Sequence, residues 1–157
     1  MIGAILGDII GSRFEFRPTL TKDFELFTKE SHFTDDTVML IAVADALINN
    51  QRVDESLKGW YSRYPDKMYG PNFRLWAEGK RASKKSIGNG AMVRLASLPF
   101  IAIDLTELEK IVVDITKLTH NSKEAKQSAL TAMHYAHSLI GSTTKTLTYS
   151  IIQKYQI

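Results

Sequence analysis

The sequence contains no cysteine among its 157 residues. This absence excludes disulfide bridges and zinc sites built on thiolates. It also favours a reducing compartment, so we expect a cytoplasmic protein. Proline is scarce as well, and its four residues fall in segments typical of turns or loops.

Excess charge and long apolar runs are also missing. The formal net charge is +3, which is too small to indicate nucleic-acid binding. One basic cluster, interpreted as a solvated face, consists of Lys80, Arg81, Lys84 and Lys85. The apolar segment 1–10 is interrupted by Asp8, follows no basic segment and is far shorter than the roughly 20 residues that span a bilayer. We therefore expect neither nucleic acid nor a membrane as a partner.

The spacing of apolar residues is helical rather than alternating, which predicts an all-α fold. The length fits a single domain over residues 1–157. Thr106 and Ser122 are expected to cap helices, and Gly141 to end one. Residues 65–90 are expected to be irregular, with at most one helical turn near Trp76. The predicted helices cover 2–12, 34–49, 54–64, 91–96, 106–118, 122–140 and 146–155.

Gly3, Gly7 and Gly11 recur every four residues in the first predicted helix. At this spacing they form a smooth stripe on one helical face, which lets another backbone approach closely. Each glycine also costs a helix on the order of 1 kcal/mol. We expect close packing or the approach of a ligand to offset that cost.

Thr34, Asp35 and Asp36 open the second predicted helix, which is apolar nearly all round and should be buried. A hydroxyl and two adjacent carboxylates are hard oxygen ligands suited to Mg²⁺ or Mn²⁺. The same residues are also good helix caps, since acids favour the positive end of the helix dipole. Both interpretations stay open on these residues alone.

Four other places could carry chemistry. Glu15 stands between two phenylalanines, where its pKa would be raised and it could act as an acid or base, or it is an exposed loop residue. The loop 88–90 could bring backbone N–H groups to a phosphate, or it is a simple turn. His120 lies between two helices, where it could bind phosphate or ribose, or belong to a capping turn. His134 and His137 have metal-ligand spacing but lack a third ligand nearby, and surface or interhelical roles are the alternative.

Taken in order along nearly the whole chain, these segments resemble the ADP-ribosylglycohydrolase family. The most specific of them is Phe33-Thr34-Asp35-Asp36-Thr37. The other matching segments are 3–12, 14–16, Tyr64-Pro65, Tyr69-Gly70, 88–94 and Thr119-His120-Asn121.

The resemblance implies an orthogonal multi-helix fold with a binuclear Mg²⁺ or Mn²⁺ centre. It implies hydrolysis of the bond between ADP-ribose and a side chain such as arginine or serine, or release of related ADP-ribose derivatives. Nearby carboxylates would stabilise an oxocarbenium-like state, and metals would orient ribose hydroxyls and activate a water. Carried over by resemblance, the metal ligands are Thr34, Asp35 and Asp36, the catalytic residues are Glu15 and Asp36, and the substrate-binding residues are Gly88, Asn89, Gly90 and His120.

The sequence departs from the family at its C-terminal end. The family has a second acidic cluster, Asp-x-Asp-Thr, that supplies the remaining metal ligands, whereas no aspartate follows Asp114 here and Glu124 is the only later acid. We therefore expect a partial domain, truncated at its C-terminus, with at most one weak metal site.

Three hypotheses about function follow. The chain is an ADP-ribosyl glycosidase that needs a complementing C-terminal half, or a catalytically inactive remnant that binds ADP-ribose or metal weakly. The third hypothesis is a helical interaction module that associates with itself through exposed apolar surface, for example as a homodimer. The expected ligands are ADP-ribose or an ADP-ribosylated protein for the first hypothesis.

Overall fold

The computed structural model of the protein describes residues 1–83, 86, 88–101 and 104–140. Every regular element in these ranges is helical, so the predicted all-α fold is confirmed. None of the helices described there is long and apolar enough to cross a membrane. In chain order, the described elements are α1 (Ile2–Gly11), η1 (Ser12–Phe14), α2 (Asp35–Ile48), α3 (Val53–Arg63), α4 (Pro71–Ala77), α5 (Gly90–Val93), η2 (Leu98–Phe100), α6 (Leu105–Thr116) and α7 (Lys123–Leu139).

The helix α2 is the centre of the fold, as its apolar sequence predicted. Leu40 and Val43 are fully buried, and the polar residues of α2 are confined to its first turn and to Asp45 near its end. The helix α3 packs against it, and the Ser56 hydroxyl donates a hydrogen bond to the Ala42 carbonyl oxygen at 2.8 Å. The core around α2 is completed by residues from α3 to α7, including Leu57, Leu98, Leu108, Val112, Ala129 and Met133.

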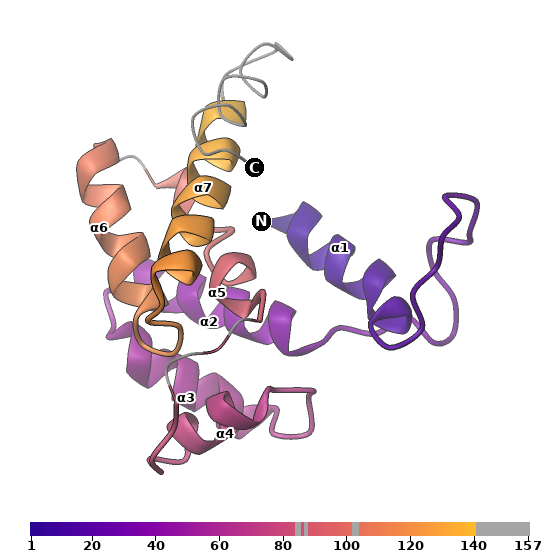
Figure 1. The fold of residues 1–157 in the computed structure, drawn as a ribbon, viewed down its shortest axis with the longest axis horizontal. Coiled ribbons are helices and arrows are strands. Elements are labelled where there is room, and N and C mark those ends of the chain that lie inside the picture. Colours follow the sequence, from indigo (N-terminus) through magenta and orange to yellow (C-terminus); the bar gives the residue numbers. More distant parts are fainter. Residues whose placement is uncertain (84–85, 87, 102–103, 141–157) are drawn as a thin grey trace.

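The helix α1 is set apart from the rest of the molecule. Figure 1 shows it at one side, joined to α2 by a long connection. It contacts α2, yet none of its residues is buried, and Ile2 is 72% exposed. A Cβ atom built on Gly3, Gly7 or Gly11 would meet nothing within 4 Å. The predicted close packing against the glycine stripe is therefore not found in the described part of the chain.

The helix α4 lies in the stretch that was expected to be irregular. Pro71 occupies its first turn, where a missing N–H costs nothing and the fixed φ favours the helix. Arg74 anchors the preceding segment, because its guanidinium donates hydrogen bonds to three backbone carbonyls, those of Pro65, Lys67 and Tyr69, at 2.7–3.2 Å. The prediction of one helical turn near Trp76 was too short, since proline was interpreted only as a breaker.

The two last described helices, α6 and α7, pack against each other. The cap of α6 is Asp104 rather than the predicted Thr106: its carboxylate accepts hydrogen bonds from the N–H groups of Thr106 and Glu107 at 2.8 and 3.1 Å. Ser122 caps α7 as predicted, with Oγ accepting from the Ala125 N–H at 3.0 Å. The predicted stop at Gly141 and the predicted helix over 146–155 lie outside the described residues.

Candidate functional site

A cavity of about 260 Å³ lies beside the start of α2. Its other walls come from α4, from the segment that leads into α5 and from the turn between α6 and α7. Acidic, amide and apolar groups face one space there: the lining includes Glu15, Asp35, Asp36, Met39, Met68, Phe73, Gly88, Asn89, Gly90, Arg94, Thr119 and His120.

The start of α2 places two carboxylates at this cavity. Thr34 is the N-cap, and its Oγ1 accepts a hydrogen bond from the Asp36 N–H at 3.2 Å. Asp35 and Asp36 form the first turn and are half-buried. The capping prediction is thus confirmed for Thr34, while the carboxylates of Asp35 and Asp36 line the cavity.

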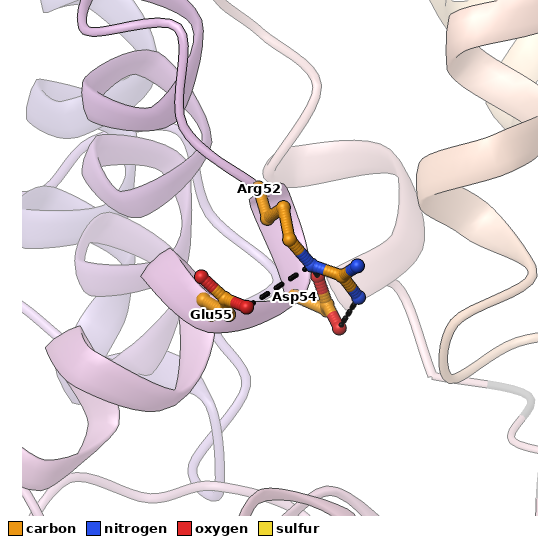
Figure 2. Close-up of polar contacts among 3 residues, drawn as sticks. All are labelled: Arg52, Asp54 and Glu55. Atoms are coloured by element: carbon orange, nitrogen blue, oxygen red, sulfur yellow. Dashed lines mark hydrogen bonds and ion pairs between the residues drawn. The ribbon is translucent and has the colours of Figure 1, made fainter.

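The start of α3 offers a comparison within the same chain, because Asp54 and Glu55 are also adjacent acids in a first turn. Arg52 pairs with both of them, at 2.8 Å from Nη2 to Asp54 Oδ2 and 3.1 Å from Nε to Glu55 Oε1 (Figure 2). Its hydrogen bond holds the pKa of Asp54 below the usual range. No described basic side chain forms an ion pair with Asp35 or Asp36. The two pairs of acids occupy the same position in a helix, but the pair of α3 is neutralised by an arginine and, within the described part of the chain, the pair of α2 is not.

The carboxylates at the cavity repel one another, and Asp35 and Asp36 are partly buried, whereas Glu15 is exposed. Burial, followed by the charges of Asp35 and Asp8, raises the pKa of Asp36 to about 6. Burial is also the main cause of the raised pKa of Asp35. The pKa of Glu15 is raised by partial burial and then by Asp36 and Asp8, so its predicted shift has the right direction, although the neighbouring acids contribute to it. A positive charge bound at this wall of the cavity would therefore be stabilised by these carboxylates.

Asp8 holds the start of α2 from the neighbouring helix α1. Its Oδ1 accepts a hydrogen bond from Thr34 Oγ1 at 2.6 Å. Its Oδ2 accepts from the Thr34 N–H at 2.8 Å, from the Thr37 N–H at 3.3 Å and from Thr37 Oγ1 at 2.5 Å. The sequence interpretation treated Asp8 only as an interruption of an apolar segment. A single acid in an otherwise apolar helix was the signal that it has a buried partner.

The loop that enters α5 reaches the same carboxylates. Asn89 Nδ2 donates a hydrogen bond to Asp36 Oδ2 at 3.3 Å. A Cβ atom on Gly90 would lie 3.9 Å from Asp36 Oδ1, so the backbone of the loop lies close to this acid. Gly88 is steadied by its N–H, which donates to Ser86 Oγ at 3.3 Å. The loop thus lies against the acidic wall, 53 residues along the chain from Asp36.

Arg94 and the turn at 119–120 form the floor of the cavity. Arg94 is 2% exposed, and its Nε donates a hydrogen bond to the Gly90 carbonyl oxygen at 2.7 Å. Its Nη2 donates to Thr119 Oγ1 at 2.8 Å and lies 3.2 Å from His120 Nδ1. Burial and the charge of Arg94 lower the pKa of His120 to about 4. His120 is therefore neutral at physiological pH.

A second groove, of about 510 Å³, runs between α1 and α5 and shares Glu15, Asp36 and Asn89 with the cavity. Two glycines of the stripe, Gly7 and Gly11, line it. The other lining residues, besides the shared ones, are Ala4, Asp8, Ser12, Thr34, Val93 and Ala96. Because nothing described fills the space over the glycines, this groove is open at its α1 side.

The structure brings most of the predicted site residues together. Glu15, Asp35, Asp36, the loop 88–90 and His120 all line the cavity, and Thr34 lines the adjoining groove. The sequence did not predict a role for Asp8 or Arg94, because the residues that they contact are distant in the sequence. His134 and His137 lie elsewhere on α7, where His134 Nε2 contacts Glu109 Oε1 of α6 at 2.7 Å.

The acidic wall fits part of a metal site. Among the described residues, no group of three or more histidine, aspartate or glutamate side chains is arranged to hold a metal ion. Asp35 and Asp36 nevertheless present hard oxygen donors without a paired cation. The Thr34 hydroxyl donates to Asp8 and accepts from the Asp36 N–H, which leaves one lone pair free. The donor set fits a hard divalent cation but is incomplete.

Comparison with known proteins identifies relatives of this chain. The chain is 26% identical over 170 residues to the ADP-ribosylhydrolase ARH3 of Xenopus tropicalis, covering 87% of this chain and 49% of that protein. It is 26% identical over 166 residues to the human protein of the same name, covering 83% of this chain and 46% of that protein. The chain thus spans about half the length of the curated relatives it matches. A family model described as ADP-ribosylglycohydrolase matches residues 1–156, and the chain therefore belongs to the ADP-ribosylglycohydrolase family.

Proposed function

We propose that this chain supplies the substrate cavity and half of the metal centre of an ADP-ribosyl glycosidase. The reaction would be hydrolysis of the glycosidic bond between ADP-ribose and a protein side chain or small acceptor. One observation carries the proposal: in a member of this family, two unpaired, half-buried carboxylates share a cavity with the loop 88–90 and His120.

The electrostatics of α2 support a divalent cation, Mg²⁺ or Mn²⁺, on Asp35 and Asp36. Burial raises the pKa of both groups, and neighbouring acids raise each of them as well: Glu15 and Asp8 for Asp35, and Asp35 and Asp8 for Asp36. Two adjacent carboxylates without a counter-charge are therefore unfavourable. Thr34 Oγ1 would be the third ligand from this side. When bound, the cation would polarise a water or a ribose hydroxyl.

Glu15 and Asp36 are the acids we propose for the chemical step. Both face the same space, and an oxocarbenium-like transition state gains stabilisation from nearby carboxylates. The raised pKa of Glu15 also makes proton exchange near neutral pH easier than for an ordinary glutamate. The loop 88–90 and His120 would hold the ADP-ribose.

We propose that full activity needs a segment that corresponds to the other half of the relatives' length. The groove between α1 and α5 suits it, since the open glycine stripe lets a helix backbone approach closely and leads directly to Asp36 and Glu15. The relatives are about twice as long as the matched region, so a segment of sufficient size exists in them. A second copy of this chain is the competing occupant.

Calorimetry tests the binding half of the proposal. The purified chain is titrated with Mn²⁺ and then with ADP-ribose, and weak binding of each is expected. An Asp35→Ala/Asp36→Ala variant should lose Mn²⁺ binding. The matched control is Asp54→Ala/Glu55→Ala, which removes the other adjacent acids at a helix start and should leave Mn²⁺ binding unchanged. Equal loss in both variants, or none in either, would refute the assigned metal site.

Activity is measured as release of ADP-ribose from a modified arginine or serine peptide. The chain is assayed alone and with an added polypeptide that covers the C-terminal half of a curated relative. Turnover only in the mixture supports the proposal. Turnover by the chain alone would remove the need for a partner, while binding without turnover in either sample would indicate an inactive remnant. Light scattering distinguishes a homodimer, and absence of any binding would favour the interaction module.

A further inference from the structure

The nearest charged neighbour of His120 is a group that can only donate hydrogen bonds. Arg94 Nη2 lies 3.2 Å from His120 Nδ1, and both side chains are buried. A guanidinium carries five N–H donors and no acceptor. Burial lowers the pKa of Arg94 to about 10, so it remains charged at neutral pH. The ring nitrogen that faces Arg94 must therefore present a lone pair.

Thr119 is consistent with the same proton arrangement. Its Oγ1 accepts a hydrogen bond from Arg94 Nη2 at 2.8 Å and lies 2.8 Å from His120 Nδ1. Since the hydroxyl already accepts from Arg94, its own proton is free to point at Nδ1. Two donors then converge on one imidazole nitrogen. The proton of a neutral ring must sit on the other nitrogen, Nε2.

We propose that Arg94 is a positioning residue that fixes His120 as the neutral tautomer with its proton on Nε2. None of the described residues accepts a hydrogen bond from Nε2, and His120 lines the cavity. The other charged groups at this cavity, Glu15, Asp35 and Asp36, are on its acidic side. His120 then offers ligands a fixed N–H donor. It is neither a metal ligand through Nδ1 nor a base at neutral pH.

The chemistry of this donor defines what it recognises. A neutral N–H selects an acceptor oxygen without requiring a negative charge, so a sugar hydroxyl or a phosphate oxygen would satisfy it. This consequence rests on the proposed function, whereas the tautomer itself does not. The two claims can therefore fail separately.

Long-range proton–nitrogen NMR on the ¹⁵N-labelled full chain reads the tautomer directly. The sequence has four histidines, and the His120 signals are assigned as those missing from a His120→Gln variant. At pH 7, the expected spectrum shows an unprotonated Nδ1 and a protonated Nε2 for His120. A proton on Nδ1, or a doubly protonated ring at this pH, would overturn the proposal.

Variants assign the effect to Arg94. In Arg94→Met the two tautomers should both become populated, and the pKa of His120 should rise from about 4 toward the ordinary value of about 6.5. Thr119→Val is the control, and it should keep the wild-type tautomer because Arg94 still faces Nδ1. An unchanged tautomer and pKa in Arg94→Met would refute the role of Arg94. If Arg94→Met does not fold, Arg94→Gln decides: its amide oxygen can accept a hydrogen bond from Nδ1, so both tautomers should be populated, and a wild-type spectrum would refute the role of Arg94.

Ligand binding tests the donor itself. His120→Gln can place an amide N–H near the position of Nε2, whereas His120→Asn reaches only the position of Nδ1. We expect ADP-ribose affinity to be largely kept in His120→Gln and to fall about tenfold in His120→Asn, the effect of one lost hydrogen bond. Equal affinity in both variants would refute the donor role. Absence of ADP-ribose binding to the wild-type chain would refute the proposed function and leave the NMR result standing.

Discussion

Replacement of Asp8 by alanine should destabilise the protein more than its position in an exposed helix suggests. The carboxylate accepts hydrogen bonds from two N–H groups and two hydroxyls at the start of α2. Thr34 and Thr37 are 4% and 5% exposed, so their polar groups have little other access to water. The change also removes a main connection between α1 and α2, because α1 has no buried residue of its own.

The magnitude follows from these contacts. A hydrogen bond to a charged group contributes about 1.5–3 kcal/mol, and loss of a helix cap costs about 1 kcal/mol. The four hydrogen bonds share one carboxylate and are not additive, and water can enter from the adjoining groove. Loss of Asp8 also relieves its repulsion of Asp36 and Glu15. We therefore expect the free energy of unfolding to fall by about 2–3 kcal/mol in Asp8→Ala.

Urea denaturation followed by circular dichroism at pH 7 measures this change. Asp114→Ala is the control, since Asp114 pairs only with Lys117 at the surface, at 2.6 Å, and should change stability by less than about 0.5 kcal/mol. Asp8→Asn should lie between the two, because its carbonyl can still accept from the N–H groups while the Thr34 hydroxyl reverses to accept from the amide. An Asp8→Ala variant no less stable than Asp114→Ala would refute the role of Asp8.

Three further predictions concern stability. The pKa of His120 is about 4 in the folded protein and that of an unfolded histidine is about 6.5, so the unfolded state binds more protons between these values. Wild-type stability should therefore fall relative to His120→Gln by about 3 kcal/mol as pH drops from 7 to 4, and parallel pH profiles in urea denaturation would contradict this. Gly7→Ala should stabilise the protein by up to about 1 kcal/mol and so raise its melting temperature, because a Cβ atom at this position meets nothing within 4 Å. A lower melting temperature would show that the glycine stripe is packed in solution. Ser122→Ala should cost about 1 kcal/mol in urea denaturation through loss of the α7 cap, and no loss would show that water replaces it.

Local signals predicted most of the helices and two of the three caps, Thr34 and Ser122. A cap such as Ser122 acts on an N–H group three residues away, so its partner is visible in the sequence itself. The same local rule failed at α6, where Asp104 outcompetes Thr106 for the first N–H groups. It failed again at α4, because a proline in the first helical turn was interpreted as a break.

The candidate site also combines features that the sequence predicts with features that depend on distant residues. The order of motifs along the chain indicated the family and most of the residues that line the cavity, since motif order needs no coordinates. The acid pair at the start of α2 was ambiguous from sequence, as the acids of α3 have the same local pattern. The tertiary structure distinguished the two pairs by their surroundings, because Arg52 neutralises one pair at the surface and burial raises the pKa values of the other.

The sequence by itself determined that the chain is helical, which helix is central and where two adjacent carboxylates begin it. These properties depend on apolar spacing and on hydrogen bonds between close neighbours. Only the tertiary structure decided that Asp8 holds the start of α2 from 26 residues away, that Arg94 faces His120 across a similar separation, and that the glycine stripe is open. A hydrogen bond or a gap between distant segments depends on how the helices pack, and that information is not contained in any one segment.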